Sequence, residues 1–225
     1  MGIQGFLAVI TKIENALLDR LKRGLGGLVY GVSSYTGQFD DPELDIRRLP
    51  VALVSYGGTK SSSVNVGMSS GKRFKNVDTF VVLVISRSFH SEQTGRHGSL
   101  IRVGANQLIE AVKYLLINQT LGQLVEPIKP LRVRTLWNNK EVKKEKLSAY
   151  AIEFEISYLQ APALEDGRYP EGSDDESNIE YLFKHYQAEL DEPYPDLSAI
   201  AGKIYNPTNN AEVGFEVKLN ESKSD

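Results

Sequence analysis

Three groups of residues have types that could take part in catalysis or ligand binding: the histidines, a pair of neighbouring aspartates and a glycine-lysine segment. His90 and His97 are seven residues apart and His185 lies far downstream, so none has the spacing of a zinc-binding HExxH helix. Asp40 and Asp41 are adjacent, and the side chains of consecutive residues diverge in a regular segment. The start of a short helical turn explains them better than an acid/base pair does.

The glycine-lysine segment is Gly67-Met-Ser-Ser-Gly71-Lys72-Arg73. A phosphate-binding loop of the Walker type needs four residues between its glycines and a Ser or Thr after the lysine. This segment has three residues between its glycines and Arg73 after the lysine. The chain also has no GxGxxG motif and no cysteine, which excludes disulfides and thiolate chemistry. We therefore expect a protein that is not an enzyme, with no catalytic residue, cofactor or metal site.

Basic residues around an expected long strand suggest a different kind of function. Gathered at one rim or in a lumen, they would suit phosphate backbones or an acidic protein partner. The alternative is scattered, solvated charge. No recognition helix or zinc finger supports sequence-specific binding of nucleic acid. The rim or lumen candidates are Lys72, Arg73, Lys75, Arg87 and Arg96.

Charge divides the chain into two regions. Residues 1–160 carry 21 basic and 14 acidic side chains, a balance of +7, and residues 161–225 carry 5 and 15, a balance of −10. The 225 residues, 41% of them hydrophobic, are enough for one domain with an appendage or for two small domains. The apolar runs are too short to span a bilayer, so we expect a soluble intracellular protein without membrane contact.

Hydrophobic periodicity predicts the main elements. Apolar residues that recur at three- and four-residue steps indicate helices over Phe6–Arg23 and Leu100–Asn118. Alternating or continuous apolar residues indicate strands over the ranges 28–35, 51–56 and 77–88, followed by a hairpin over 131–137 and 147–159. This order predicts an α+β fold: one mostly antiparallel β-sheet with two main helices packed on one face.

Two further expectations concern the end of this fold and the region beyond it. In the second hairpin arm one face is apolar, whereas the face from Ala149 to Ser157 should be in water or meet a partner. We expect a domain over residues 1–160 and an acidic extension over 161–225. The extension begins as a linker and includes a short helix within Ile179–Glu189 and a terminal strand at Glu212–Leu219.

An ordered set of motifs carries a family resemblance. The motifs are ENALLDRLKRGL, SYTGQFDD, RRLPVALVSYGG, FVVLVISRSFHSEQTGRHG, GANQLIEAVKYLL and PIKPLRVRTLWN. In this order and spacing they resemble the Mu-like phage tail-terminator family over roughly residues 10–158. No single motif is specific, and the region from Ala161 onward has no counterpart.

The resemblance implies a structural protein of the virion tail or neck, assembled in the host cytoplasm. Such a subunit forms a homo-oligomeric ring, expected to be hexameric, that caps a contractile tail. The ring stops tail growth and provides the head-joining surface. The implied partners are the tail tube protein, the tail sheath protein, the head-tail connector and, transiently and without sequence specificity, the DNA in the lumen.

A closed ring needs a patch on one subunit that meets a different patch on the next. The segment around Phe39 is one candidate for the subunit or tube interface, with Asp40, Asp41, Arg47 and Arg48. The alternative is that Phe39 is in the core and the arginines pair with the aspartates of their own chain. The ranges Lys60–Lys75 and Asn138–Lys146 are further candidates for protruding contacts.

Three other functions remain open at this point. The chain could be a head-tail connector or another tail structural protein. It could be an enzyme that uses His90 or His97. It could also be a nucleic-acid-binding module, which predicts an affinity for DNA that falls steeply with salt.

Overall fold

The computed structural model describes residues 6–35, 49–64, 73–87, 103–136, 147–193, 199–206 and 211–218. The chain divides into two compact units, a first unit over Met1–Ala163 and a second unit over Leu164–Asp225. Within the described residues, no helix is long and apolar enough to cross a membrane.

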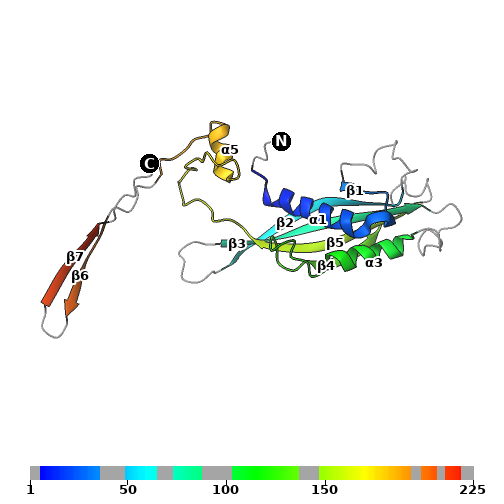
Figure 1. Ribbon diagram of the computed structural model, residues 1–225, viewed down its shortest axis with the longest axis horizontal. Helices are drawn as coiled ribbons and strands as arrows, with labels where there is room; N and C mark the ends of the chain where they lie inside the picture. The colour runs from blue at the N-terminus through cyan, green and yellow to red at the C-terminus, as the bar shows by residue number, and fades with distance from the viewer. Residues whose placement is uncertain are drawn as a thin grey trace. The chain divides into compact units, whose positions relative to one another are not determined.

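The first unit is a sheet covered by helices (Figure 1). Its elements in chain order are α1 (Val9–Leu25), a 3-10 turn (Gly26–Leu28), β1 (Gly31–Ser34), β2 (Val51–Val64), β3 (Arg73–Arg87), α3 (Ala105–Leu116), β4 (Lys129–Thr135) and β5 (Leu147–Leu159). The five strands lie in the order β1-β2-β3-β5-β4. β1 runs parallel to β2 and every other neighbouring pair is antiparallel.

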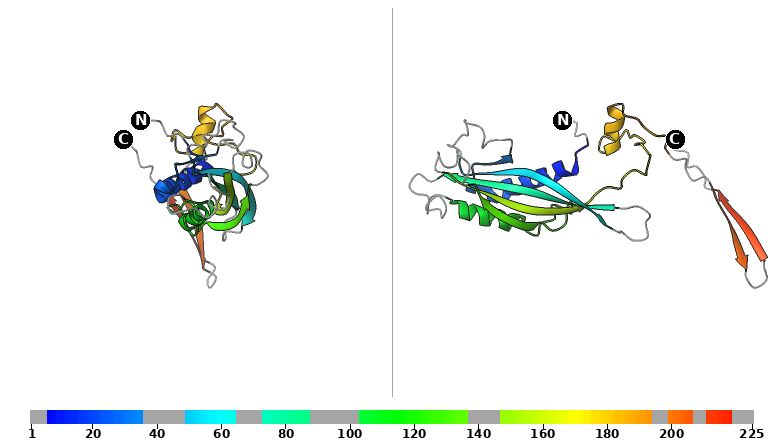
Figure 2. Two further views of the ribbon diagram at one scale, coloured as in Figure 1. Left: turned by 90° about the vertical axis from the view of Figure 1, so that its right-hand side faces the viewer. Right: turned by 180° about the vertical axis from the view of Figure 1, so that it is seen from behind.

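Both helices pack on the same face of the sheet, as the end-on view in Figure 2 shows. α1 contacts β1, β2 and α3, whereas α3 contacts β3 and β5. The predicted α+β class, the mostly antiparallel sheet and the two helices on one face are therefore confirmed. The apolar strand β3 lies inside the sheet, with β2 on one side of it and β5 on the other.

The helices bury the residues that their periodicity indicates. α1 buries Ile13, Leu17, Leu21 and Leu25 at a strict four-residue step, and it ends at Gly26, whose φ of 46° favours glycine. The buried stripe of α3 continues to Leu116, whereas the neighbouring Leu115 is only partly buried.

β2 is longer than expected. The glycine pair Gly57-Gly58 was expected to close the strand after Tyr56. In the structure the pair forms an irregularity between Tyr56 and Thr59, and pairing with β3 resumes at Thr59↔Asp78 and continues to Val64↔Arg73. Gly58 has a φ of 109°, a conformation that residues with a side chain rarely adopt, so the pair acts here as a bulge.

Apolar side chains are buried on both faces of the sheet. The helix-side core contains Phe80, Val82, Val84, Ile152, Phe154 and Ile156 together with residues of both helices. The opposite face has its own buried cluster of Leu53, Leu83, Ile85, Leu147, Ala149 and Ala151. The face of β5 expected to meet water or a partner is therefore largely buried within the chain itself, including Glu153 and Ser157.

The second unit contains α5 (Ile179–His185) and two strands, β6 (Ala199–Asn206) and β7 (Ala211–Lys218), that pair only with each other among the described residues. Around α5, Arg168 pairs with Asp191 at 3.2 Å and Lys184 pairs with Asp174 at 2.7 Å. The segment thus has specific contacts that a plain linker lacks. The sequence pattern indicated one terminal strand where the structure has a hairpin.

The helix-side core generates a stability prediction. Leu108 of α3 is fully buried, so Leu108→Ala should lower the free energy of unfolding by about 2–5 kcal/mol through lost burial and the cavity that remains. Tyr114 on the same helix is 89% exposed, and Tyr114→Ala should change it by at most about 0.5 kcal/mol. Chemical denaturation of both variants measures the difference, and equal losses would contradict the packing described here.

Candidate functional site

The structure describes only part of the candidate set from the sequence. Phe39, Asp40, Asp41, Arg47 and Arg48 lie outside the described residues, as do Lys72, Arg96, His90 and His97. Of the basic candidates, Arg73 and Lys75 lie at the beginning of β3 and Arg87 is its last residue.

The position of these basic residues on β3 limits what they can do together. Fourteen residue steps separate Arg73 from Arg87, a span of roughly 46 Å at the rise of a β-strand. The chain therefore places Arg73 and Lys75 at the opposite end of β3 from Arg87. Lys75 is also paired, because its Nζ lies 2.7 Å and 2.6 Å from the two carboxylate oxygens of Glu126.

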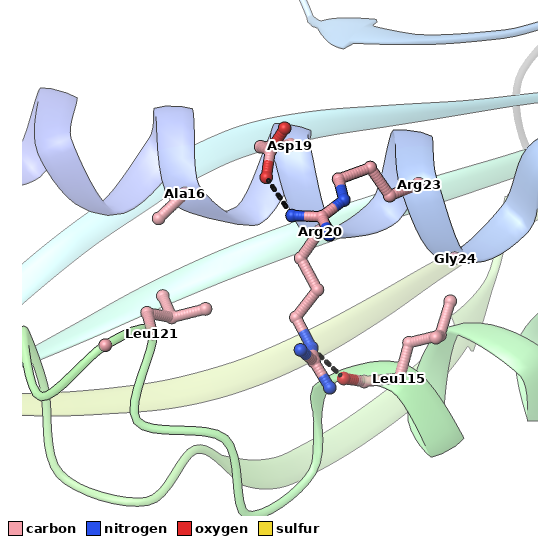
Figure 3. A pocket seen from close by; sticks show the side chains of 8 residues that line it. Ala16, Asp19, Arg20, Arg23, Gly24, Leu115 and Leu121 are labelled. Carbon is pink, nitrogen blue, oxygen red and sulfur yellow. Dashed lines mark hydrogen bonds and ion pairs between the residues drawn. The ribbon is translucent and has the colours of Figure 1, made fainter.

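A surface hollow of about 510 Å³ lies where α1 meets the end of α3 (Figure 3). Arg20 of α1 crosses the hollow and donates from Nε to the backbone carbonyl of Leu115 at 2.5 Å. This carbonyl belongs to the last turn of α3, where unpaired carbonyls and the helix dipole favour a cation. Arg23 pairs instead with Asp19 at 3.5 Å. The arrangement joins two helices, and we assign it a structural role.

Asp78 is a buried carboxylate on the helix side of β3, beside the bulge in β2. It is 0% exposed, and Thr59 donates a hydrogen bond to its Oδ1 at 2.5 Å. Its Oδ2 is buried without a hydrogen-bond partner among the described residues. Burial raises the pKa of Asp78, and hydrogen bonds from Thr59 and Tyr158 to this carboxylate oppose the rise only in part. No cluster of three acidic or histidine side chains suited to a metal ion occurs in the described part of the chain.

The strongest charged arrangement lies on the opposite face, where β4 meets β5. Glu153 is 3% exposed, and each of its carboxylate oxygens accepts a hydrogen bond from a different arginine. Arg132 Nε lies 2.7 Å from Oε2 and Arg134 Nε lies 2.5 Å from Oε1. We call these three residues the Arg–Glu–Arg cluster. Two guanidinium groups share one carboxylate, so the cluster has a net charge of +1.

The geometry of the sheet produces this cluster. Arg132 is paired with Glu153 and Arg134 with Ala151, so both arginines project from the same face as Glu153. Burial by itself raises the pKa of Glu153, but the two arginines outweigh burial and hold that pKa below its ordinary value. The arginines remain half exposed, with 61% and 50% of their side chains accessible. The cluster therefore has a buried anion and an outward-facing cationic rim.

The cluster lies on an open sheet edge. β4 pairs only with β5 among the described strands, and all seven of its residues are exposed. The backbone groups on its outer side can therefore pair with another strand. The sequence interpretation missed this site because its charges are about twenty positions apart and meet only when the hairpin register is known. The R-x-R pattern of residues 132–134 opposite a single glutamate was the available signal.

Comparison with known proteins gives one family. The family described as "Bacteriophage Mu, Gp37" matches residues 9–159, which run from the start of α1 to the end of β5. A chain in the solved structure titled "Virion of native gene transfer agent (GTA) particle" aligns with a TM-score of 0.39 and 15% identity, over 68% of this chain and 98% of that chain. No curated protein matches the sequence.

Glu153→Gln removes the charge that both arginines bind. We expect it to lower the free energy of unfolding by about 1.5–3 kcal/mol, the usual value of hydrogen bonds to a charged group. Because the pKa of Glu153 is lowered on folding, the stability that it contributes is present at neutral pH and is lost as the pH falls through its folded pKa. Denaturation curves should therefore converge for wild type and variant on acidification.

The matched control for this variant is Glu155→Gln. Glu155 lies two residues along the same strand and pairs with Lys129 at 3.6 Å, but it is 35% exposed. Its loss should cost at most about 1 kcal/mol. Equal effects of the two substitutions would contradict the special role of the Arg–Glu–Arg cluster.

Asp78 should show the opposite dependence on pH. Since its pKa is raised on folding, its contribution to stability is complete below the pKa of the unfolded chain and is lost as the pH rises through the folded pKa. The unfolding temperature of Asp78→Asn minus that of wild type should therefore increase as the pH rises from about 4 to about 8. Asp19→Asn, at a position that is 68% exposed, serves as the control. Parallel curves for Asp78→Asn and wild type would refute this assignment.

Proposed function

The chain belongs to the Bacteriophage Mu, Gp37 family, and on this premise we propose that it is a tail terminator. In this role, copies of the chain form a ring on the last ring of the tail tube and sheath. The ring stops tail growth and then presents a surface to the connector of the head.

The extent of the family match carries the proposal. Residues 9–159 include both helices and all five strands of the main sheet. The two helices and the strands β1, β2, β3 and β5 share one helix-side core, and β4 is paired with β5, so the region that defines the family is one folded body. Membership in a phage family over this whole body supports a structural role in a phage particle.

The first unit also has the physical properties that a ring subunit needs. A cyclic assembly joins two different patches, and an open strand edge is a ready contact of this kind. β4 supplies such an edge, with a cationic rim beside it. The balance of +7 over residues 1–160 suits a ring through which DNA passes, because a strongly basic lumen would retain the DNA.

The remaining assignments follow from this function. We propose a non-enzymatic protein that contacts the tube, the sheath and the connector in the neck of the virion. Three basic residues of β3 remain candidates for the lumen: Arg73, Lys75 and Arg87. Because they lie at opposite ends of the strand, Arg73 and Lys75 would line the lumen at a different height along its axis from Arg87. The segment from Phe39 to Arg48 remains a candidate for the subunit or tube interface.

Deletion of the gene tests the function directly. If the protein ends tail growth, electron microscopy of lysates from the deletion strain should show overlong tails of variable length that are not joined to heads. Expression of the intact gene in the same strain should restore a uniform length and joining. Tails of normal length would refute the terminator role, and normal tails left without heads would favour a head-tail connector.

A further inference from the structure

The hairpin of the second unit has two chemically different faces. The pairs Ile200↔Val217, Gly202↔Phe215 and Ile204↔Val213 lie on one face, and Phe215 lies over Gly202, so closely that a Cβ there would come within 2.7 Å of the ring. The other face has Glu212, Glu216, Lys203 and Lys218, and Lys203 pairs with Glu212 at 3.0 Å. The hairpin is thus amphipathic, although it has only two strands.

The apolar face is uncovered. Its five large side chains are 44–64% exposed, which is unusual for apolar residues that lie next to one another in a regular element. A two-stranded hairpin alone is at best marginally stable in water, and it needs a third strand or a packing partner. The hairpin therefore has the composition expected of an element that becomes stable only when a further strand or another surface packs against it.

The outer edge of β4 matches the hairpin in pattern. On β4, Val133 is paired with Ile152 and so lies on the helix side, whereas Arg132 and Arg134 lie on the opposite side. On β7, Val213, Phe215 and Val217 share the apolar face. Its polar face has Glu212, Glu216 and Lys218, with a net charge of −1. When the two apolar sides are aligned, alternation along each strand brings both glutamates to the side of the arginines.

We propose that the β6–β7 hairpin of one copy adds to the outer edge of β4 in a second copy, with β7 next to β4. The glutamates of β7 then neutralise the excess positive charge of the Arg–Glu–Arg cluster, and Val133 extends the apolar face of the hairpin. β6 is the less suitable neighbour, because its only charged side chain is Lys203, whereas β7 has two glutamates beside Lys218. The proposal rests on the ring function, which places copies of the chain side by side.

The edge is also protected against other strands. Pro130 and the irregularity between Pro130 and Arg132 disrupt pairing at the beginning of β4, and the charges of the cluster disfavour basic or purely apolar strands. An acidic, alternating strand such as β7 is the type that this edge accepts. Strand addition of this kind takes its affinity from backbone hydrogen bonds and its specificity from alternate side chains.

The absence of cysteines from the chain allows a direct cross-linking test. Val133→Cys and, separately, Val213→Cys, Phe215→Cys or Val217→Cys are introduced into two full-length copies of different size. The two copies are expressed together with the other phage genes. A bismaleimide that reaches about 8 Å, the separation of diagonal neighbours across two strands, should join the copies. Tyr114→Cys on α3, 89% exposed, replaces Val133→Cys as the control and should give no product.

Each outcome decides the proposal. A product with the combined mass of the two copies, from at least one hairpin position, supports it. A double variant that cross-links only within its own chain would show that the hairpin lies on its own β4 and would overturn docking between copies. The absence of both products would exclude β4 as the site. Since this assay reads contacts and not tail length, its failure is distinguishable from the failure of the terminator function.

A charge reversal tests the same contact without touching the first unit. Glu212→Lys with Glu216→Lys should reduce the cross-linked product at least about ten-fold, because two repulsive contacts replace two attractive ones. Glu176→Lys with Glu189→Lys makes the same change in net charge at exposed positions outside the hairpin and should leave the yield unchanged. Equal yields from both double variants would remove the electrostatic basis of the proposal.

Discussion

The register between β3 and β5 is the constraint on which the rest of the first unit depends. The two strands pair without a shift from Lys75↔Leu159 to Arg87↔Leu147. A slip of one residue would move Ile152, Phe154 and Ile156 out of the helix-side core and place Glu153 beneath the helices, away from both arginines. The apolar alternation of β5 and the need to pair its buried carboxylate thus favour the same register, and this agreement makes the arrangement specific.

The elements that the sequence predicts well are those with long, regular patterns. Both helices and the strands β3 and β5 follow from apolar periodicity, because burial of one stripe or one face dominates their energetics. The alternation of β4 was also recognisable, although all of its residues are exposed. The extension of β2 was missed because a glycine pair indicates the end of a strand as readily as it indicates a bulge within one. β6 was missed because its apolar residues are interrupted by Gly202 and Lys203, and only its pairing with β7 defines it as a strand.

The candidate site was harder to predict than the fold for a physical reason. Loop charges such as Asp40 and Arg47 are conspicuous in a sequence, but the structure does not describe them. The charges that the structure does bring together lie on two strands of a hairpin, on the face of β5 that looked exposed. That face is buried because Arg132 and Arg134 lie over Glu153, and because Ala149 and Ala151 are small enough to pack in a second cluster. A glutamate that follows two alanines on one face of an alternating strand therefore suits burial as well as exposure, and only the opposing strand decides which it is.

The open edge of β4 has a thermodynamic consequence for assembly. A chain that covered this edge with its own sixth strand would be safer against aggregation, but it would lose a directional contact for another subunit. The acidic, amphipathic hairpin is connected to the first unit through a separate segment, so the complementary parts occur in equal number in every copy. In the heterologous ring proposed above, every copy therefore supplies one hairpin and one β4 edge. When the ring closes, no hairpin and no edge is left unpaired. The opposite charges of the two units, +7 over residues 1–160 and −10 over residues 161–225, have the signs that such a pairing between copies requires.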